Sequence, residues 1–335
     1  GLGASQNGEV AWLKKRGISF TRVDVSQCAT FRVVEVLGVQ ADALDLTTDQ
    51  GQDFGHDLAE RLRGIGELGQ AVRLRRRLVR ATAGAKGETS MPTLRAKNDL
   101  AVLLIELGGG SGSGGSSGSD WTEVHALYTE VIDGYTMQLG STHTETLCAK
   151  MGLANLLRNL SKASDARSLF AEVVDGRSGQ LGPAHIATLN AKLNLAVLHD
   201  ELGEWAEARV LYTEVIQGFA KQLGPTHSET LGAKMNLANL LAVFGEKVEP
   251  RTLFTEVIAG YAEQLGPTHT RTLDVKYNLG ALLFGEGDLT GAKALFEQCV
   301  DGYSATYGPS HSETADAQKA VESCTLHDRS CVQHS

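Results

Sequence analysis

The sequence has no continuous apolar run of about 18 residues, so it lacks a candidate membrane-spanning helix. It also opens without the basic and then apolar segment of a secretory signal. The five cysteines are scattered and form no Cys-x-x-Cys pair, which predicts a reducing compartment, the cytoplasm. Basic residues are outnumbered, with 31 Lys and Arg against 40 Asp and Glu, and the net charge of −9 argues against a general nucleic-acid binder.

Motifs of known chemistry are missing as well. We find no Walker loop, no nucleophile with a base and an orienting group, and no His, Asp or Glu cluster with metal-ligand spacing. The sequence therefore predicts no enzyme, no catalytic residue, no cofactor and no metal site. The residue in excess is glycine, with 38 among 335 residues against about 7% in average proteins.

Many of these glycines follow an internal repeat of 42 residues. A Thr-Leu pair, a glycine and a histidine recur at this interval. The Thr-Leu pairs start at Thr146, Thr188, Thr230 and Thr272. The glycines are Gly140, Gly182, Gly224, Gly266 and Gly308, and the histidines are His143, His185, His227, His269 and His311. One earlier interval is longer by an 11-residue Gly/Ser insert at 109–119, whose origin, natural or engineered, stays open. Repeats of this length bury their apolar faces by stacking on one another.

Each repeat predicts two helices. In the best-defined repeat, apolar stripes at helical spacing cover 189–198 and 208–219. Gly203 after the first stripe suits a left-handed C-cap. Thr226, with Glu229 three residues later, predicts a capping box at the start of the next helix. The sequence thus predicts an all-α fold, a right-handed α-solenoid of antiparallel helix pairs.

The predicted boundaries leave the two ends of the chain outside the repeats. We expect six repeats and a capping helix (about Glu313 to Ser323) over 52–325, and a disordered tail over 326–335. Residues 1–51 form an unassigned lead-in, with an alternating, strand-like run from Ile18 to Val25, and we expect that a longer N-terminal part can precede Gly1. Residues 13–26 resemble a helix–strand joint of a glutaredoxin-type fold, without its redox cysteine; a divergent or truncated lead-in is the preferred interpretation.

The pattern L-G-x-W-x-E-A-x-x-L-Y at 202–212 resembles a tetratricopeptide repeat. The 42-residue length and the link LGPTHSETL at 223–231 resemble the kinesin light chain branch of that family. The resemblance covers about 52–325, and no heptad coiled coil of a true light chain accompanies it. It implies a superhelix whose first helices line a concave groove, where asparagines hold peptide ligands.

Asparagine recurs on one polar face of the predicted first helices. Such a residue lowers helix propensity, and its amide both donates and accepts, which suits the backbone of an extended peptide. The predicted groove residues are Asn155, Asn190, Asn194, Asn236, Asn239, Asn278 and Arg95. Asp200, Glu201 and Asp274 are expected to bias side-chain choice, while Asp99 and Gly152 depart from the asparagine pattern. The alternative is that the asparagines only solvate the surface.

Three further series repeat with the same period. Equivalent histidines sit on helices that pack about 8–10 Å apart, too far to share a metal, so each is expected beside a capping Thr or Ser at a helix start. Lysines of the first helices (Lys97, Lys150, Lys192, Lys234 and Lys276) are expected to pair with Glu130, Glu172, Glu214 and Glu256 of the second helices, with Gln298 in the last repeat.

Residues 61–97 carry ten Lys or Arg against Glu67 and Glu88. A nucleic-acid surface lacks support because no aromatic residues interleave with the charges, so an acidic partner or a solvated helix is preferred. We expect a protein or peptide partner, acidic at this end, and neither a nucleic acid nor a membrane; the oligomeric state stays open.

The main functional hypothesis is a non-enzymatic protein–protein interaction scaffold that binds an extended peptide or partner protein in the concave groove. The alternative is a regulatory repeat arm of a larger signalling enzyme, with an ATPase or redox domain outside this sequence. A third possibility is a structural spacer with an empty groove.

Overall fold

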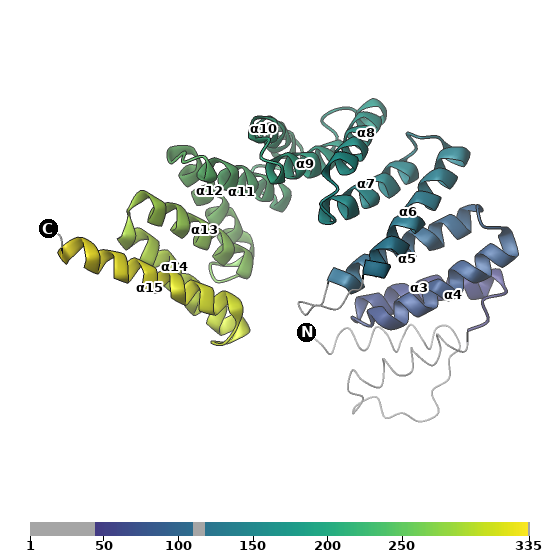
Figure 1. The fold of residues 1–335 in the computed structure, drawn as a ribbon, viewed down its shortest axis with the longest axis horizontal. Helices are drawn as coiled ribbons and strands as arrows, with labels where there is room; N and C mark the ends of the chain where they lie inside the picture. Colours follow the sequence, from purple (N-terminus) through teal and green to yellow (C-terminus); the bar gives the residue numbers. More distant parts are fainter. Residues whose placement is uncertain (1–43, 110–117, 334–335) are drawn as a thin grey trace, which may run out of the picture. The chain divides into compact units, whose positions relative to one another are not determined.

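The structure, a computed structural model, describes residues 44–109 and 118–333, and the elements in these two stretches are helices (Figure 1). The chain divides into two compact units, residues 1–160 and 161–335. The strand expected from Ile18 to Val25 and the centre of the Gly/Ser insert lie outside the described residues.

Consecutive helices pack against each other within each unit, which confirms the predicted all-α solenoid of helix pairs. The first unit contains α3 (Asp49–Gly64), α4 (Leu68–Lys86), α5 (Met91–Gly109), α6 (Gly118–Leu139) and α7 (Thr144–Asn159). The second unit contains α8 (Ala163–Leu181), α9 (Ile186–Glu201), α10 (Trp205–Gln222), α11 (Ser228–Val243), α12 (Val248–Leu265), α13 (Thr270–Glu286), α14 (Leu289–Tyr307) and α15 (Ser312–Gln333). None of the described helices is long and apolar enough to span a bilayer.

The C-terminal helix is longer than the sequence analysis predicts. Helix α15 continues to Gln333, beyond the predicted end of the capping helix at about Ser323. The physical reason is visible in the sequence, because neither glycine nor proline follows Pro309 to stop a helix.

The periodic threonines and glycines form a repeated joint between helices. Each threonine is buried, and its Oγ1 donates a 2.9 Å hydrogen bond to the carbonyl of the glycine six residues earlier. In the link before α11, Thr230 bonds to Gly224, whose φ of +104° is a conformation that favours glycine. The pairing satisfies a buried hydroxyl and explains why the two residue types share one period.

The helix caps correct the sequence-based prediction. Thr226 is not the N-cap of α11; the cap is His227, with extended ψ of 145°, and its Nδ1 accepts from the backbone N–H of Glu229 at 3.2 Å. The same cap occurs at His143, His185 and His269. The helix starts one residue later than the capping box requires, because the His227 carbonyl accepts the first helical hydrogen bond, from Leu231, at 2.9 Å. The histidines therefore have a structural role. They are the N-cap residues themselves, whereas the sequence predicts each one beside a capping Thr or Ser.

The predicted partner ladder is confirmed where both members lie in one unit. Lysine and glutamate meet at 2.8 Å for Lys97–Glu130, and at 2.7 Å for Lys192–Glu214 and Lys234–Glu256. In the last repeat, Lys276 donates to Gln298 Oε1 at 2.9 Å. The lysine stems are mostly buried while the glutamates remain about half exposed, so each pair ties the first helix of a repeat to the second at its solvated edge.

A further glycine series, which the sequence analysis missed, lies inside the second helices. A Cβ added at Gly218 would lie 2.5 Å from Leu189 Cδ1 on the preceding helix. The equivalent contacts are Gly134 with Leu94, Gly260 with Leu231, and Gly302 with Leu273, at 2.6, 2.7 and 2.4 Å. These glycines allow the two helices of a repeat to pack closely, with the leucine buried against the bare backbone.

Candidate functional site

The predicted groove residues of the second unit lie on three neighbouring first helices. Helices α9, α11 and α13 contact one another in sequence order, α9 with α11 and α11 with α13. Asn190 and Asn194 lie on α9, Asn236 and Asn239 on α11, and Asn278 on α13, all half-buried. The other two predicted residues belong to the first unit, where Asn155 is half-buried on α7 and Arg95 is exposed on α5.

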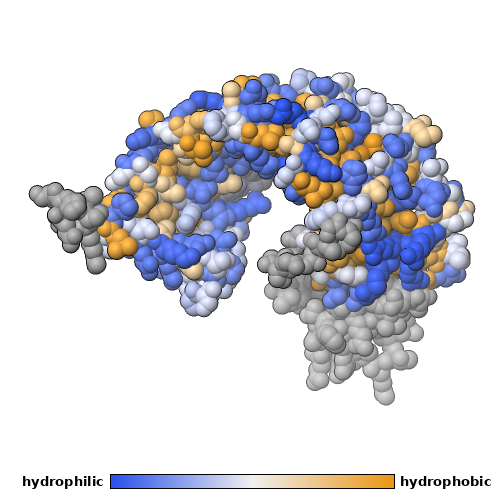
Figure 2. All heavy atoms as spheres, in the orientation of Figure 1, coloured by the Kyte–Doolittle hydropathy of each residue, from blue (hydrophilic) through white to orange (hydrophobic). Residues whose placement is uncertain are grey.

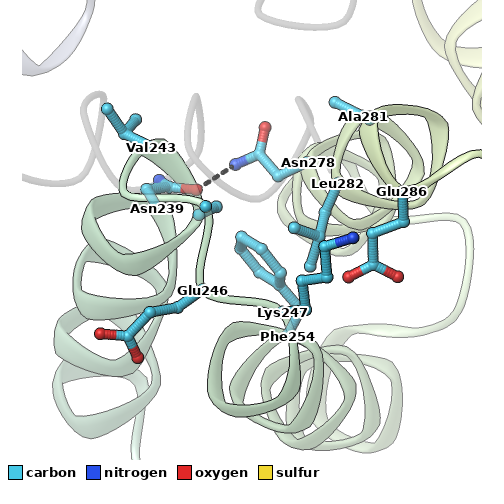
Figure 3. Close-up of a pocket in the computed structure, with 12 residues that line it drawn as sticks. Asn239, Val243, Glu246, Lys247, Phe254, Asn278, Ala281, Leu282 and Glu286 are labelled. Carbon is cyan, nitrogen blue, oxygen red and sulfur yellow. Dashed lines mark hydrogen bonds between the residues drawn. The ribbon is translucent and has the colours of Figure 1, made fainter.

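The asparagine amides are not equivalent. Asn194 Nδ2 donates to the Asn190 carbonyl at 2.9 Å, within its own helix. Asn278 Nδ2 donates to Asn239 Oδ1 at 3.1 Å and so bridges two first helices (Figure 3). Asn236 makes no hydrogen bond to another described residue. Because an amide has two donor hydrogens and an acceptor oxygen, each retains capacity for a ligand, and Asn236 retains the most.

Asn236 lines a cavity of about 390 Å³. Its lining includes Leu193, Tyr261, Arg271 and Asp274, which come from α9, α12 and α13. Asp274 is held by the Tyr303 hydroxyl, which donates to its Oδ1 at 2.6 Å. Burial and this carboxylate together raise the pKa of Tyr303, so the phenol stays a donor and Asp274 keeps a fixed orientation.

A second cavity of about 500 Å³ lies at the other end of α11 and α13. Apolar residues dominate its wall, and Phe254 of α12 and Leu282 of α13 point into it (Figure 3). The Asn239–Asn278 bridge lies at one side, and the polar groups at the opposite side include Glu246 and Glu286. The two cavities place convergent polar groups beside apolar walls, an arrangement typical of binding sites.

The two departures from the asparagine pattern have structural explanations. Asp99 takes part in an ion pair with Arg75 of α4, at 3.0 Å. At Gly152, a Cβ would lie 2.6 Å from the Tyr128 hydroxyl, so glycine makes room for the buried tyrosine. The first unit therefore uses these two positions of the asparagine series for pairing and packing rather than for free amides.

Half of the basic residues of the first unit's 61–97 region pair with acids of the same unit. Arg75, only 2% exposed, pairs with Glu60 at 2.7 Å as well as with Asp99, and its Nη1 donates to His56. Elsewhere in the region Arg63 pairs with Glu106, Arg76 with Glu123, Lys86 with Asp49, and Lys97 with Glu88. A buried arginine at position 75 was not foreseen, since its neighbours in sequence are also basic. The internal pairing weakens the charge argument for an acidic partner at this end.

Burial also changes the titration of the His56 cluster. Desolvation, and secondarily the Arg75 cation, lower the pKa of His56. Desolvation raises the pKa of Asp99 despite the nearby Arg75. Among the described residues, no group of three His, Cys, Asp or Glu side chains is placed to hold a metal ion, and this cluster joins a cation to two acids instead.

The surface next to the second cavity carries exposed apolar side chains. Trp205 and Phe244 stack edge to face with ring centroids 4.4 Å apart, and Val243 and Val248 are 77% and 81% exposed. Figure 2 shows apolar surface interspersed with hydrophilic surface on the visible face. These residues extend the apolar lining of the cavity toward the turns between paired helices.

The fold and this face define a repeat protein built from helix pairs. Family models described as tetratricopeptide repeat match residues 145–221 and 272–313. The chain therefore contains tetratricopeptide repeats at these residues, in line with its 42-residue period. No curated protein matches the chain.

Solved structures share the fold at low sequence identity. One is the structure of a Podosopora anserina putative kinesin light chain, whose TPR-like repeats are described as nearly identical. It shares 24% sequence identity with this chain, covers 64% of this chain and 96% of its own, and has a TM-score of 0.54. BtubC (BKLC) from P. vanneervenii is 18% identical, with 75% and 92% covered and a TM-score of 0.56. A Rap protein solved in complex with Competence and Sporulation Factor is 11% identical, with 89% and 80% covered and a TM-score of 0.54. This fold is consistent with a protein–protein interaction scaffold.

Proposed function

We propose that the chain is a non-enzymatic interaction scaffold of the cytoplasm, and that α9, α11 and α13 bind an extended peptide segment of a partner protein. The observation that carries the proposal is Asn236, a half-buried amide beside a cavity of about 390 Å³, with no hydrogen bond to another described residue. The Asn236 amide is partly exposed, so a ligand can bond to it, and each hydrogen bond formed contributes about 1 kcal/mol.

The surrounding chemistry fits a peptide backbone. A backbone presents alternating N–H donors and carbonyl acceptors, and the amides of Asn194, Asn236 and Asn278 offer both functions on successive helices. Arg271 and Asp274, at the Asn236 cavity, supply opposite charges for side-chain selection. A structure with the same fold was solved with a bound factor, which supports the idea that such a stack holds a ligand.

In the first unit, Arg95 and Asn155 remain proposed binding residues. Arg95 is exposed and makes no ion pair with a described residue, whereas most basic neighbours already have acidic partners. An acidic segment of the partner would therefore meet Arg95 rather than the basic residues that already pair with acids.

The test is a peptide-array screen with the full chain, followed by calorimetric titration of the strongest peptide. Replacement of Asn194, Asn236 and Asn278 together by alanine is expected to weaken binding by tenfold or more, since each lost hydrogen bond contributes about 1 kcal/mol. The melting temperature should change little, because all three side chains are only half-buried. The exposed Gln217→Ala on α10 is the matched control; equal affinity in the triple variant and the control would reject the groove.

A further inference from the structure

The cavity between α11, α12 and α13 contains an unexplained carboxylate. Glu286 is the last residue of α13, and its side chain is 13% exposed. Its Oε1 is buried and has no hydrogen-bond partner (Figure 3). The other oxygen, Oε2, lies 3.8 Å from Arg251, beyond hydrogen-bond range.

The position of Glu286 is unfavourable for the helix itself. The C-terminus of a helix carries partial negative charge, so a carboxylate there is repelled where a lysine or arginine would be attracted. Burial also removes Oε1 from water, and no hydrogen bond within the protein compensates for that desolvation cost. A carboxylate at the wall of a cavity that opposes local stability in two respects, with only a long ion pair to Arg251 in its favour, is expected to serve a ligand.

The other charged groups near the cavity satisfy Glu286 only in part, through a long ion pair of Arg251 with its Oε2. Glu246 is engaged by Arg209 at 2.8 Å. Arg251 lies between Glu286 and Asp288, at 3.8 and 3.7 Å. Lys247, a second cation, is among the described residues that line the cavity, but it makes no ion pair with Glu286. The remaining lining is mainly apolar, with Phe254 and Leu282 directed inward (Figure 3).

We propose that this cavity receives an arginine or lysine side chain of the bound peptide, and this assignment rests on the proposed function. The aliphatic stem packs on Phe254 and Leu282, while the cationic head pairs with the Glu286 carboxylate. Such a side chain matches both parts of the cavity, because its stem is apolar and its head is charged. A purely apolar side chain would fill the volume and leave the carboxylate oxygen without a partner.

A substitution at a neighbouring residue can block the ligand side chain from the cavity while Glu286 is kept. A Cβ placed on Gly285, which also lines the cavity, meets no atom within 4 Å. Gly285→Leu therefore adds bulk at the cavity without a clash at its first atom. Helix propensity also favours this replacement, since leucine is a better helix former than glycine.

The experiment selects random-sequence displayed peptides on the full chain and counts the residues recovered. Arginine and lysine are expected to be enriched at one position, and the best arginine peptide should bind about tenfold or more tightly than its neutral citrulline counterpart, as for a hydrogen bond to a charged group. Glu286→Gln and Gly285→Leu should each abolish this enrichment. Glu263→Gln, an exposed glutamate of α12 outside the cavity lining, is the charge-matched control and should preserve it.

Thermal melting separates a ligand role from a structural one. Glu286→Gln should melt at the same temperature as the parent chain or higher, because the amide no longer opposes the helix C-terminus. A lower melting temperature with loss of binding would mark Glu286 as structural and overturn the assignment.

The sequence of the selected peptides distinguishes the two proposals. Peptides that depend on Asn194, Asn236 and Asn278 but lack arginine or lysine, for example with leucine enriched, would overturn the cavity assignment alone. If no peptide is selected, or if selected peptides bind the asparagine variant equally well, the proposed function fails and this inference with it.

Discussion

The glycines inside the second helices allow us to predict both the sign and the size of the stability change caused by a Gly→Ala substitution. Glycine inside a helix is normally less stable than alanine by about 0.5–1 kcal/mol, so Gly→Ala should stabilise. At Gly218 the new Cβ would lie 2.5 and 2.7 Å from the two methyl groups of Leu189, which is 2% exposed. Overpacking of a buried site costs about 1–3 kcal/mol, which exceeds the propensity gain. We expect Gly218→Ala to lose roughly 1 kcal/mol in net stability.

Gly285 is the matched control for this substitution. It also lies inside a helix of the second unit, and its added Cβ would meet nothing within 4 Å. Gly285→Ala should therefore gain about 0.5–1 kcal/mol. Urea unfolding of the full chain, followed by circular dichroism, measures both changes. Stabilisation of similar size in both variants would refute the close-packing explanation of the 42-residue glycine series.

Three further predictions concern the joints and the first unit. His227→Ala should destabilise the chain by about 1 kcal/mol through loss of the cap, while His227→Asn should retain most of the stability; equal loss in both would contradict a capping role. Thr230→Val should cost about 1 kcal/mol, because the Thr230 hydrogen bond is lost while the Gly224 carbonyl keeps its bond from the His227 N–H; unchanged urea unfolding would contradict this. The lowered pKa of His56 means that the unfolded chain binds a proton that the folded chain resists, so stability should fall as the pH drops below about 6.5. His56→Asn should reduce that fall, as measured by melting temperature across pH 5–8; an identical pH profile would exclude His56 as its source.

The period of the sequence was sufficient to predict the helical fold. Apolar stripes, the glycine after each stripe and the Thr-Leu pairs are local signals, and local signals decide helix ends. The lysine ladder was also predictable, since both partners share one interval. The identity of the cap was not, because Thr226 and His227 are adjacent candidates and only the backbone angles choose between them.

Features that depend on neighbouring helices were beyond the sequence pattern. Gly218 looks like any helix-interior glycine until Leu189 is seen against it. Arg75 looks exposed among its basic neighbours, yet packing buries it between two acids. The asparagine face was predicted as a set of equal amides, whereas Asn278 is bonded to Asn239 and Asn236 has no such partner among the described residues.

The central claim is that α9, α11 and α13 hold an extended peptide. Hydrogen exchange of the full chain, with and without the strongest array peptide, tests it most directly, because exchange reports which helices a ligand protects. The account predicts added protection on the first helices, largest around Asn236 and Asn278, with little change on α10 and α14. Protection confined to the second helices, with α9, α11 and α13 unchanged at saturating peptide, would contradict it.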